Sequence, residues 1–170
     1  MEEAARRGLP NAPDTPSALE AFAKPENAAL FEKYGVMTAR ELRSRHEILL
    51  EDYAKKIRIE GACARDIAAE MIVPAVKAEF LETAQALSAA GAVEVSSGTS
   101  ALRTELVVLG KGLDDLKENI ADLNIALDDD NTEEIVSNAL SLRTAADALE
   151  RIVSSARWPL PKYRDMLFLY

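Results

Sequence analysis

Apolar residues recur mostly every three or four positions over about forty residues in the first half of the chain. The recurring positions are Leu42, His46, Leu49, Tyr53, Ile57, Ala64, Ile67, Met71, Ala75, Ala78 and Leu81. This spacing predicts one helix over residues 38–90, about 75 Å long. Thr38 and Glu41 form a capping-box pattern at its start. Gly61 and Pro74 interrupt the pattern, and we expect a kink at Pro74 because proline removes a backbone hydrogen bond.

Two further helices follow, and both have a heptad-like seam. In the first, which we predict over 100–127, the seam is Leu102, Leu106, Leu109, Leu113, Leu116, Ile120, Leu123 and Leu127. In the second, predicted over 132–157, it is Ile135, Ala139, Leu142, Ala146, Leu149, Val153 and Ala156. Asn131 is placed to cap the second helix. Because so short a linker joins them, the two helices must be antiparallel neighbours.

The pattern therefore predicts an all-α fold, in which a long kinked helix and an antiparallel helical hairpin form a three-helix bundle over residues 38–157. Residues 1–37 are rich in proline and read as an extended lead-in with short helices, one capped by Thr15 and one from Asn27 to Tyr34. Residues 158–170 begin with Trp-Pro-Leu-Pro and read as an extended aromatic tail. The hairpin is long enough to cover only the part of the long helix after Gly61. The apolar stripe before it needs another partner.

Composition and charge narrow the class of protein. The chain has 170 residues with 29 alanines and 21 leucines but nine aromatic residues, which favours helices. Its one cysteine excludes an intramolecular disulfide, and its net charge of -9 argues against a nucleic-acid partner. Nothing at its start resembles a signal peptide, and no apolar run approaches the roughly 20 residues of a membrane span. We expect a soluble, cytoplasmic chain that contacts no membrane.

The charges are unevenly distributed along the chain. Between Leu102 and Glu134 there are three basic and ten acidic residues, so the predicted hairpin is strongly acidic. The first half of the long helix has two basic clusters, which are Arg40, Arg43 and Arg45, and then Lys55, Lys56 and Arg58. A solvated acidic face explains the hairpin. For the basic clusters, docking on an acidic protein surface stays open as an alternative to simple solvation.

Two segments resemble ligand-binding loops only in part. Gly110-Lys111-Gly112 lies inside a leucine seam, and Glu105 stands where a Walker loop has its first glycine. We interpret these glycines as helix positions that permit close packing. Asp128, Asp130 and Thr132 match the start of a calcium loop, but Glu133 and Ala139 replace its essential glycine and glutamate. We interpret this segment as a capped turn between two helices.

Isolated reactive residues add no site. His46 is the single histidine, and we expect it on a helix face or in an interface. Cys63 stands among small residues, which predicts a buried apolar position. The sequence shows no catalytic triad, dinucleotide fingerprint or Cys/His cluster. We therefore assign no catalytic, cofactor-binding or metal-binding residue to this chain.

Several segments resemble the C-terminal region of type III glutamine synthetases. They are Gly8-Leu9-Pro10-Asn11, Leu30-Phe31-Glu32-Lys33-Tyr34-Gly35-Val36, Glu41 to Ile48, Tyr53 with Lys56, Ile57, Ile59 and Glu60, and Trp158-Pro159-Leu160-Pro161-Lys162-Tyr163 with Asp165, Leu167 and Phe168. The resemblance spans the chain and is strongest at 8–60 and 158–168. It implies that these residues are part of a much longer cytoplasmic ring enzyme that uses ATP and magnesium to join ammonia to glutamate. That family's catalytic motifs lie upstream of the matched region, so none is transferred here.

Two functional hypotheses follow. In the first, the chain is a non-catalytic helical module that docks on the catalytic portion of the same enzyme and supports its assembly into a homo-oligomer. In the second, it is a stand-alone helical adaptor or signalling protein whose leucine seams recruit a partner helix. Whether the chain by itself has any enzymatic activity stays open.

Overall fold

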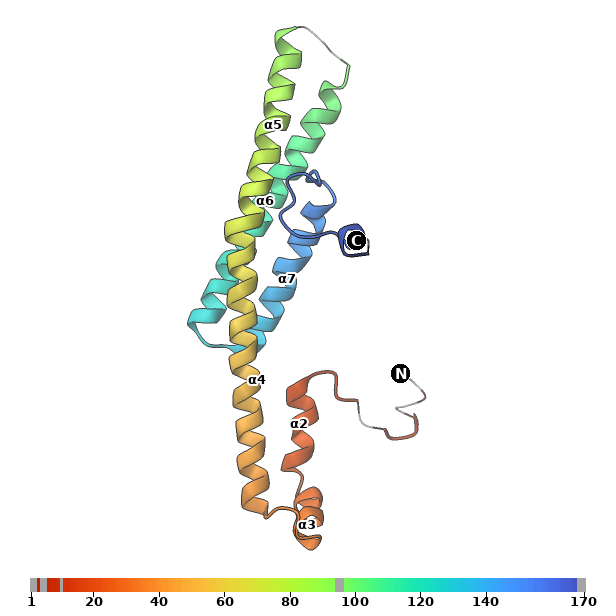
Figure 1. Cartoon of the computed structure of the whole chain (residues 1–170), viewed down its shortest axis with the longest axis vertical. Coiled ribbons are helices and arrows are strands. Elements are labelled where there is room, and N and C mark those ends of the chain that lie inside the picture. Colours follow the sequence, from red (N-terminus) through yellow and green to blue (C-terminus); the bar gives the residue numbers. More distant parts are fainter. Residues whose placement is uncertain (1–2, 4–5, 10, 94–96, 168–170) are drawn as a thin grey trace. The chain divides into compact units, whose positions relative to one another are not determined.

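The computed structural model describes residues 3, 6–9, 11–93 and 97–167, and every regular element in that part of the chain is helical (Figure 1). The all-α prediction is confirmed. Packing divides the chain into two compact units, Met1–Ile57 and Arg58–Tyr170, which we describe separately. Helix α4, Ala39–Ile67, contributes residues to both. Among the helices of the described ranges, none is long and apolar enough to cross a membrane.

In the first unit, helices α2 and α3 precede α4. Helix α2 spans Thr15–Ala23, and helix α3 spans Pro25–Lys33. The cap of α2 is Asp14 and not Thr15 as predicted, because the Ser17 amide donates to Asp14 Oδ1 at 2.8 Å. Gly35 follows α3 with a φ of 63°, a left-handed conformation that stops the helix, as the sequence predicts.

The start of α4 confirms the capping box. The Thr38 amide donates to Glu41 Oε2 at 2.8 Å, and the Glu41 amide donates to Thr38 Oγ1 at 3.3 Å. These two bonds satisfy amides that the first turn of a helix leaves without a partner. They lower the pKa of the Glu41 carboxyl, first through the Thr38 backbone amide and then through the Thr38 hydroxyl.

The long helix passes Pro74 through a π-helical turn. Segment η1, Ala68–Ile72, joins α4 to helix α5, Val73–Ala92, and the Val73 amide donates to the Ala68 carbonyl five residues earlier. A wider turn accommodates the proline, which has no amide hydrogen and crowds the preceding turn. The irregularity that we expected as a kink at Pro74 is thus a π turn just before it.

Helices α6, Thr99–Asp128, and α7, Thr132–Glu150, follow. Helix α6 packs on α5 and on α7, and both α6 and α7 contact η1 (Figure 1). Buried residues on the two helices recur every seven positions. They are Leu109, Leu116 and Leu123 on α6 and Ile135, Leu142 and Leu149 on α7. The Asn131 side chain accepts from the Glu134 amide at 3.3 Å, as predicted.

The buried face of the long helix in the second unit differs from the predicted stripe. Its buried residues are Gly61, Ala68, Ile72, Val73, Val76 and Thr83. Met71 and Leu81, which the periodicity placed in the core, are exposed. The reason is Gly61: a methyl group there would lie 2.6 Å from Ile135 Cγ2, so the glycine face is the one that approaches the hairpin.

The C-terminal segment also differs from the prediction. Helix α7 ends at Glu150 and not at residue 157, and a short helix α8, Tyr163–Leu167, lies in the tail that we predicted to be extended. Trp158 is buried in the second unit. Arg157 Nη1 contacts Glu79 Oε2 at 3.1 Å, and Ser154 Oγ donates to the same carboxylate at 2.8 Å. The segment after α7 therefore folds back onto α5.

Candidate functional site

The structure places the two partial ligand motifs in packing roles. A methyl group on Gly112 would come within 2.6 Å of Leu149 Cδ2. A methyl group on Gly110 would make only an ordinary contact, 3.6 Å from Phe80 Cε2. Asp130 lies in the turn between α6 and α7 with a φ of 53°, and its carboxylate pairs with Arg58 at 2.5 Å. These contacts agree with our interpretation of close helix packing and a capped turn.

The isolated reactive residues have different outcomes. His46 is half-buried on α4, in agreement with a position on a helix face. Cys63 is exposed, so the prediction of a buried apolar position was wrong. Within the described residues, no three His, Cys, Asp or Glu side chains gather as a metal site would require.

The first unit buries few of its side chains. Of its described residues, only Leu19 and Leu42 are buried. Within this unit, in α3, in α4 and between them, the large apolar side chains that stay exposed are Leu30 (53%), Tyr34 (70%), Val36 (58%), Ile48 (59%) and Leu49 (40%). Contiguous exposed apolar patches often mark interaction sites in proteins. We call these five residues the exposed apolar set of the first unit.

The two basic clusters of α4 differ in how they are paired. Lys55 contacts Glu51 and Lys56 contacts Asp52, each at 2.6 Å and one helical turn apart. Arg40 and Arg43 are exposed and form no ion pair with a described residue. The charges at the start of α4 are therefore available to an acidic partner, whereas those of the second cluster are compensated locally.

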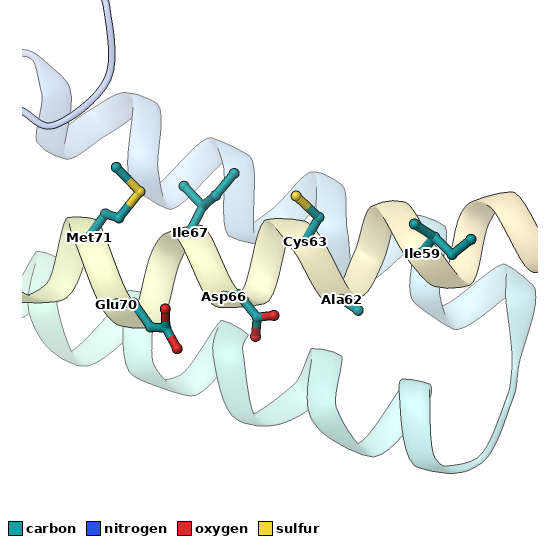
Figure 2. A pocket seen from close by; sticks show the side chains of 7 residues that line it. All are labelled: Ile59, Ala62, Cys63, Asp66, Ile67, Glu70 and Met71. Carbon is teal, nitrogen blue, oxygen red and sulfur yellow. The ribbon is translucent and has the colours of Figure 1, made fainter.

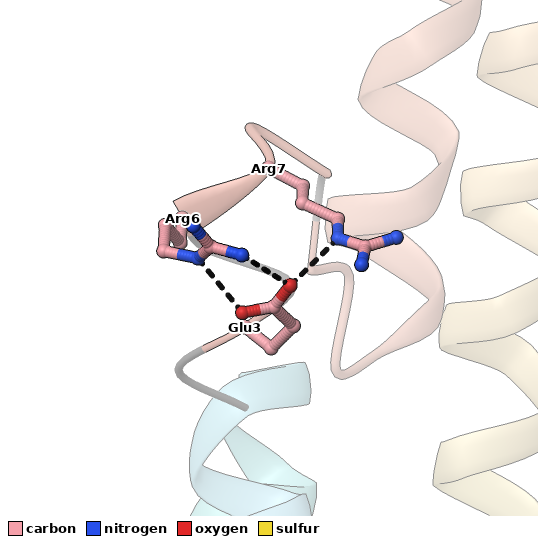
Figure 3. A network of polar contacts seen from close by, with 3 residues as sticks. All are labelled: Glu3, Arg6 and Arg7. Atoms are coloured by element: carbon pink, nitrogen blue, oxygen red, sulfur yellow. Dashed lines mark hydrogen bonds and ion pairs between the residues drawn. The ribbon is translucent and has the colours of Figure 1, made fainter.

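A small ion-pair network lies near the start of the chain (Figure 3). Arg6 Nε and Nη2 donate to the two carboxylate oxygens of Glu3 at 2.8 and 2.6 Å, and Arg7 Nε donates to Glu3 Oε1 at 2.8 Å. Arg6 and then Arg7 lower the pKa of the Glu3 carboxyl. All three side chains are exposed, and such pairs contribute little to stability. The charged groups of this network therefore interact with one another.

A shallow pocket of about 420 Å³ lies on the outer face of the long helix in the second unit. It is lined by Ile59, Ala62, Cys63, Asp66, Ile67, Glu70 and Met71. Figure 2 shows Ile59, Cys63, Ile67 and Met71 along one edge of the helix and Asp66 and Glu70 beside them. Sequence reasoning missed this surface because it assigned Ile67 and Met71 to the core. The signal was Gly61, a small residue that marks the opposite face as the packed one.

These features define a helical domain with exposed apolar side chains on both of its units. The family model of the glutamine synthetase C-terminal domain matches residues 1–90, and the chain belongs to this family. The resemblance that the sequence motifs indicated is thereby confirmed. The match includes the whole first unit, η1 and most of α5, and it ends before α6 begins.

Individual relatives match over nearly the whole chain. The chain is 30% identical over 184 residues to a type-3 glutamine synthetase of Dictyostelium discoideum, which covers 99% of this chain and 25% of that protein. It is 29% identical over 188 residues to a glutamine synthetase of Butyrivibrio fibrisolvens, covering 99% of this chain and 26% of that protein. A glutamine synthetase of Bacteroides fragilis (strain YCH46) is 31% identical over 188 residues, with 98% and 25% covered.

The chain thus spans about a quarter of the length of the relatives it matches. No solved structure matches it.

Proposed function

We propose that this chain is the non-catalytic helical module of a type III glutamine synthetase and that its first unit docks on the catalytic portion of the same enzyme. The parent enzyme would join ammonia to glutamate with ATP and magnesium, which the catalytic portion would bind. No residue described here is assigned to ATP, metal or substrate. The cytoplasm is the compartment that we propose for such an enzyme.

The observation that carries this proposal is the composition of the first unit's surface. Among its described residues, Leu9 and the five residues of the exposed apolar set are exposed while two leucines are buried, and Arg40 and Arg43 lack ion-pair partners. An apolar area beside unpaired basic groups suits a partner surface with an apolar centre and acidic residues around it. The family match covers this entire unit, which supports the catalytic portion as the partner.

The second unit would serve as the rigid part of the module. We propose that the long helix after Gly61, together with α6 and α7, forms a three-helix bundle, because α6 packs on both α5 and α7 and α7 also contacts η1. The heptad recurrence of buried leucines supports this arrangement. We further propose that the module contributes to a homo-oligomer through its attachment to the catalytic portion.

The alternative of a stand-alone adaptor is not favoured. Its main support was the pair of leucine seams. The buried residues of those seams, such as Leu116 and Leu142, pack within the second unit and are not presented to a partner. The relatives cover the chain nearly from end to end, seams included, and are glutamine synthetases.

The test uses the full-length parent enzyme with single substitutions in its C-terminal module. Ile48→Asp places a carboxylate in the exposed apolar set, and we expect loss of the assembled state and of glutamine formation with unchanged helix content. Leu140→Asp is the matched control, because Leu140 is similarly exposed (64%) on α7. Sedimentation velocity and an activity assay measure the two variants. Assembly of the Ile48→Asp enzyme equal to that of wild type would contradict the proposal.

A further inference from the structure

The pocket on the outer face of the long helix contains a regular apolar row. Ile59, Cys63, Ile67 and Met71 follow one another at intervals of four residues (Figure 2). Ile59 is 69% exposed, Met71 is 40% exposed, and Cys63 is also exposed. Twelve residues of helix rise about 18 Å, so the row is long enough for about three turns of a partner helix. We call it the outer row.

The outer row faces solvent because the opposite side of the same helix is fixed on the hairpin. Gly61 contacts Ile135, and Ala68 and Ile72 are 2% and 3% exposed. Rotating the helix to bury the outer row would expose these residues and drive the Gly61 face away from Ile135. The row is therefore held outward by packing.

The π turn lies at one end of this surface. Glu70 and Met71 belong to η1 and are exposed. The next two residues, Ile72 and Val73, are both buried although they are adjacent in sequence. One extra residue in the turn widens the helix there, and the lining residues lie before the widened turn and within it. Such turns occur often at functional positions in helices.

The charge beside the outer row is acidic. Asp66 pairs with its neighbour Arg65 at 2.7 Å, and Arg65 also reaches Asn124 Oδ1 at 3.3 Å. Glu70 has no ion pair or side-chain hydrogen bond with any described residue, and none of the seven lining residues is basic. A partner would need lysine or arginine to match Glu70.

We propose that the outer row is a second docking site, which receives a basic amphipathic helix from the catalytic portion of the same enzyme. Apolar residues of that helix, spaced by three or four positions, would lie on the outer row while its basic residues meet Asp66 and Glu70. This inference rests on the proposed function and adds the chemistry of the helix that is bound.

Two observations favour this occupant. A second copy of the chain is disfavoured, because each outer row has the Glu70 carboxylate beside it and no basic lining residue, so two rows would offer each other no opposite charge from their lining. The catalytic portion is favoured because the relatives are about four times as long as the matched region, and because the family match includes both the first unit and the outer row. The hairpin lies beyond that match.

Cys63 provides the probe, because it lies within the outer row and is the one cysteine of this chain. The native full-length enzyme is treated with N-ethylmaleimide, and the peptide that contains Cys63 is followed by mass spectrometry. We expect Cys63 to react at least tenfold more slowly than in the urea-unfolded enzyme. Reaction at the unfolded rate would overturn the proposal.

A charge reversal tests the chemistry of the occupant. Asp66→Lys with Glu70→Lys should remove the protection of Cys63 without loss of helix content. The control is Asp114→Lys with Glu118→Lys, a pair of exposed acidic residues with the same spacing on α6, which should leave the protection unchanged. Protection that survives the reversal at Asp66 and Glu70 would overturn a basic occupant.

The two proposals fail separately. If Cys63 reacts freely while Ile48→Asp still disassembles the enzyme, the second docking site is wrong and the docking of the first unit stands. If Ile48→Asp leaves assembly intact while Cys63 is protected and the reversal releases it, the outer row is the docking surface and the role of the first unit is wrong.

Discussion

Gly61 and Ile135 approach each other so closely that a methyl group on Gly61 would lie 2.6 Å from Ile135 Cγ2. This contact joins the long helix to α7 in the second unit and selects which face of the long helix is buried. The same contact leaves the outer row of Ile59, Cys63, Ile67 and Met71 facing away from the hairpin.

Substitution at Gly61 should therefore destabilise the second unit. We expect Gly61→Ala to lower the free energy of unfolding by about 1 to 3 kcal/mol, because the added methyl forces Ile135 from its position. Gly91→Ala is the matched control: Gly91 also lies in a helix, and nothing would meet its added methyl within 4 Å. It should stabilise by about 0.5 to 1 kcal/mol. Urea unfolding followed by circular dichroism measures both. Equal effects of the two substitutions would contradict the packing argument.

The centre of the α6 seam should be costly to truncate. Leu109 is fully buried, so Leu109→Ala is expected to cost about 2 to 5 kcal/mol through lost burial and the cavity that remains. Leu140→Ala on α7, where the side chain is 64% exposed, should change stability by less than about 0.5 kcal/mol. Thermal unfolding compares the two. An unchanged melting temperature in Leu109→Ala would mean that the seam does not form the core.

Asp130 combines a left-handed backbone with an ion pair to Arg58. Asp130→Val should destabilise by about 1 to 2 kcal/mol, because a β-branched residue resists a positive φ. Asp130→Gly should differ little from wild type, since relief of the backbone strain offsets loss of an exposed ion pair. Arg58→Gln removes the ion pair alone and serves as the control. A greater loss of stability in Asp130→Gly than in Asp130→Val would show that the ion pair contributes more to stability than the backbone conformation does.

The capping box at the start of α4 should respond to acid. The pKa of Glu41 is lowered from its usual 4.5, so its carboxylate stabilises the folded state above that value, and this contribution is lost as the pH falls through the lowered pKa. Glu41→Gln keeps a capping side chain without the titration. Amide hydrogen exchange in the first turn of α4, measured from pH 7 to pH 3, should accelerate more in wild type than in Glu41→Gln. An equal acceleration of amide exchange in wild type and in Glu41→Gln would show that the Glu41 carboxylate does not stabilise the first turn of α4.

The fold of the C-terminal segment also predicts a stability effect. Trp158 is buried, so Trp158→Ala should destabilise the second unit by about 3 kcal/mol. Arg157→Ala removes the contacts with Glu79 and Glu82 and should shift the fluorescence of this single tryptophan to longer wavelength. Circular dichroism follows the unfolding of Trp158→Ala, which has no tryptophan left, and tryptophan fluorescence follows Arg157→Ala. A Trp158→Ala protein as stable as wild type would show that the segment is not part of the core.

Local patterns were sufficient for much of the helical layout. The capping box at Thr38 and Glu41, the Asn131 cap and the seven-residue recurrence through Leu109, Leu116 and Leu123 involve residues within a few turns of each other. The stability of these caps and of the seam depends on residues close together in the sequence, so the sequence is enough to predict them. The short linker before Thr132 likewise leaves α6 and α7 one arrangement, side by side and antiparallel.

Contacts between distant segments could not be found in this way. Hydrophobic periodicity predicted that Met71 and Leu81 lie in the core, but both are exposed. The periodicity considers only apolar side chains, so it does not recognise a glycine as the point of closest approach between two helices. The π turn before Pro74 altered the register of the buried face, so Ile72 and Val73 are buried together. Cys63 is exposed although it stands among small residues, because Gly61 and not Cys63 lies on the face that meets the hairpin.

The sequence by itself determined the all-helical class, the caps, the two seams and the resemblance to the glutamine synthetase family, because each depends on neighbouring residues or on ordered motifs. Tertiary structure alone decided which face of the long helix meets the hairpin and where Ser154 and Arg157 return to α5. It also decided which apolar residues stay exposed on each unit. The physical reason is that these outcomes depend on the fit between residues such as Gly61 and Ile135, which are 74 positions apart.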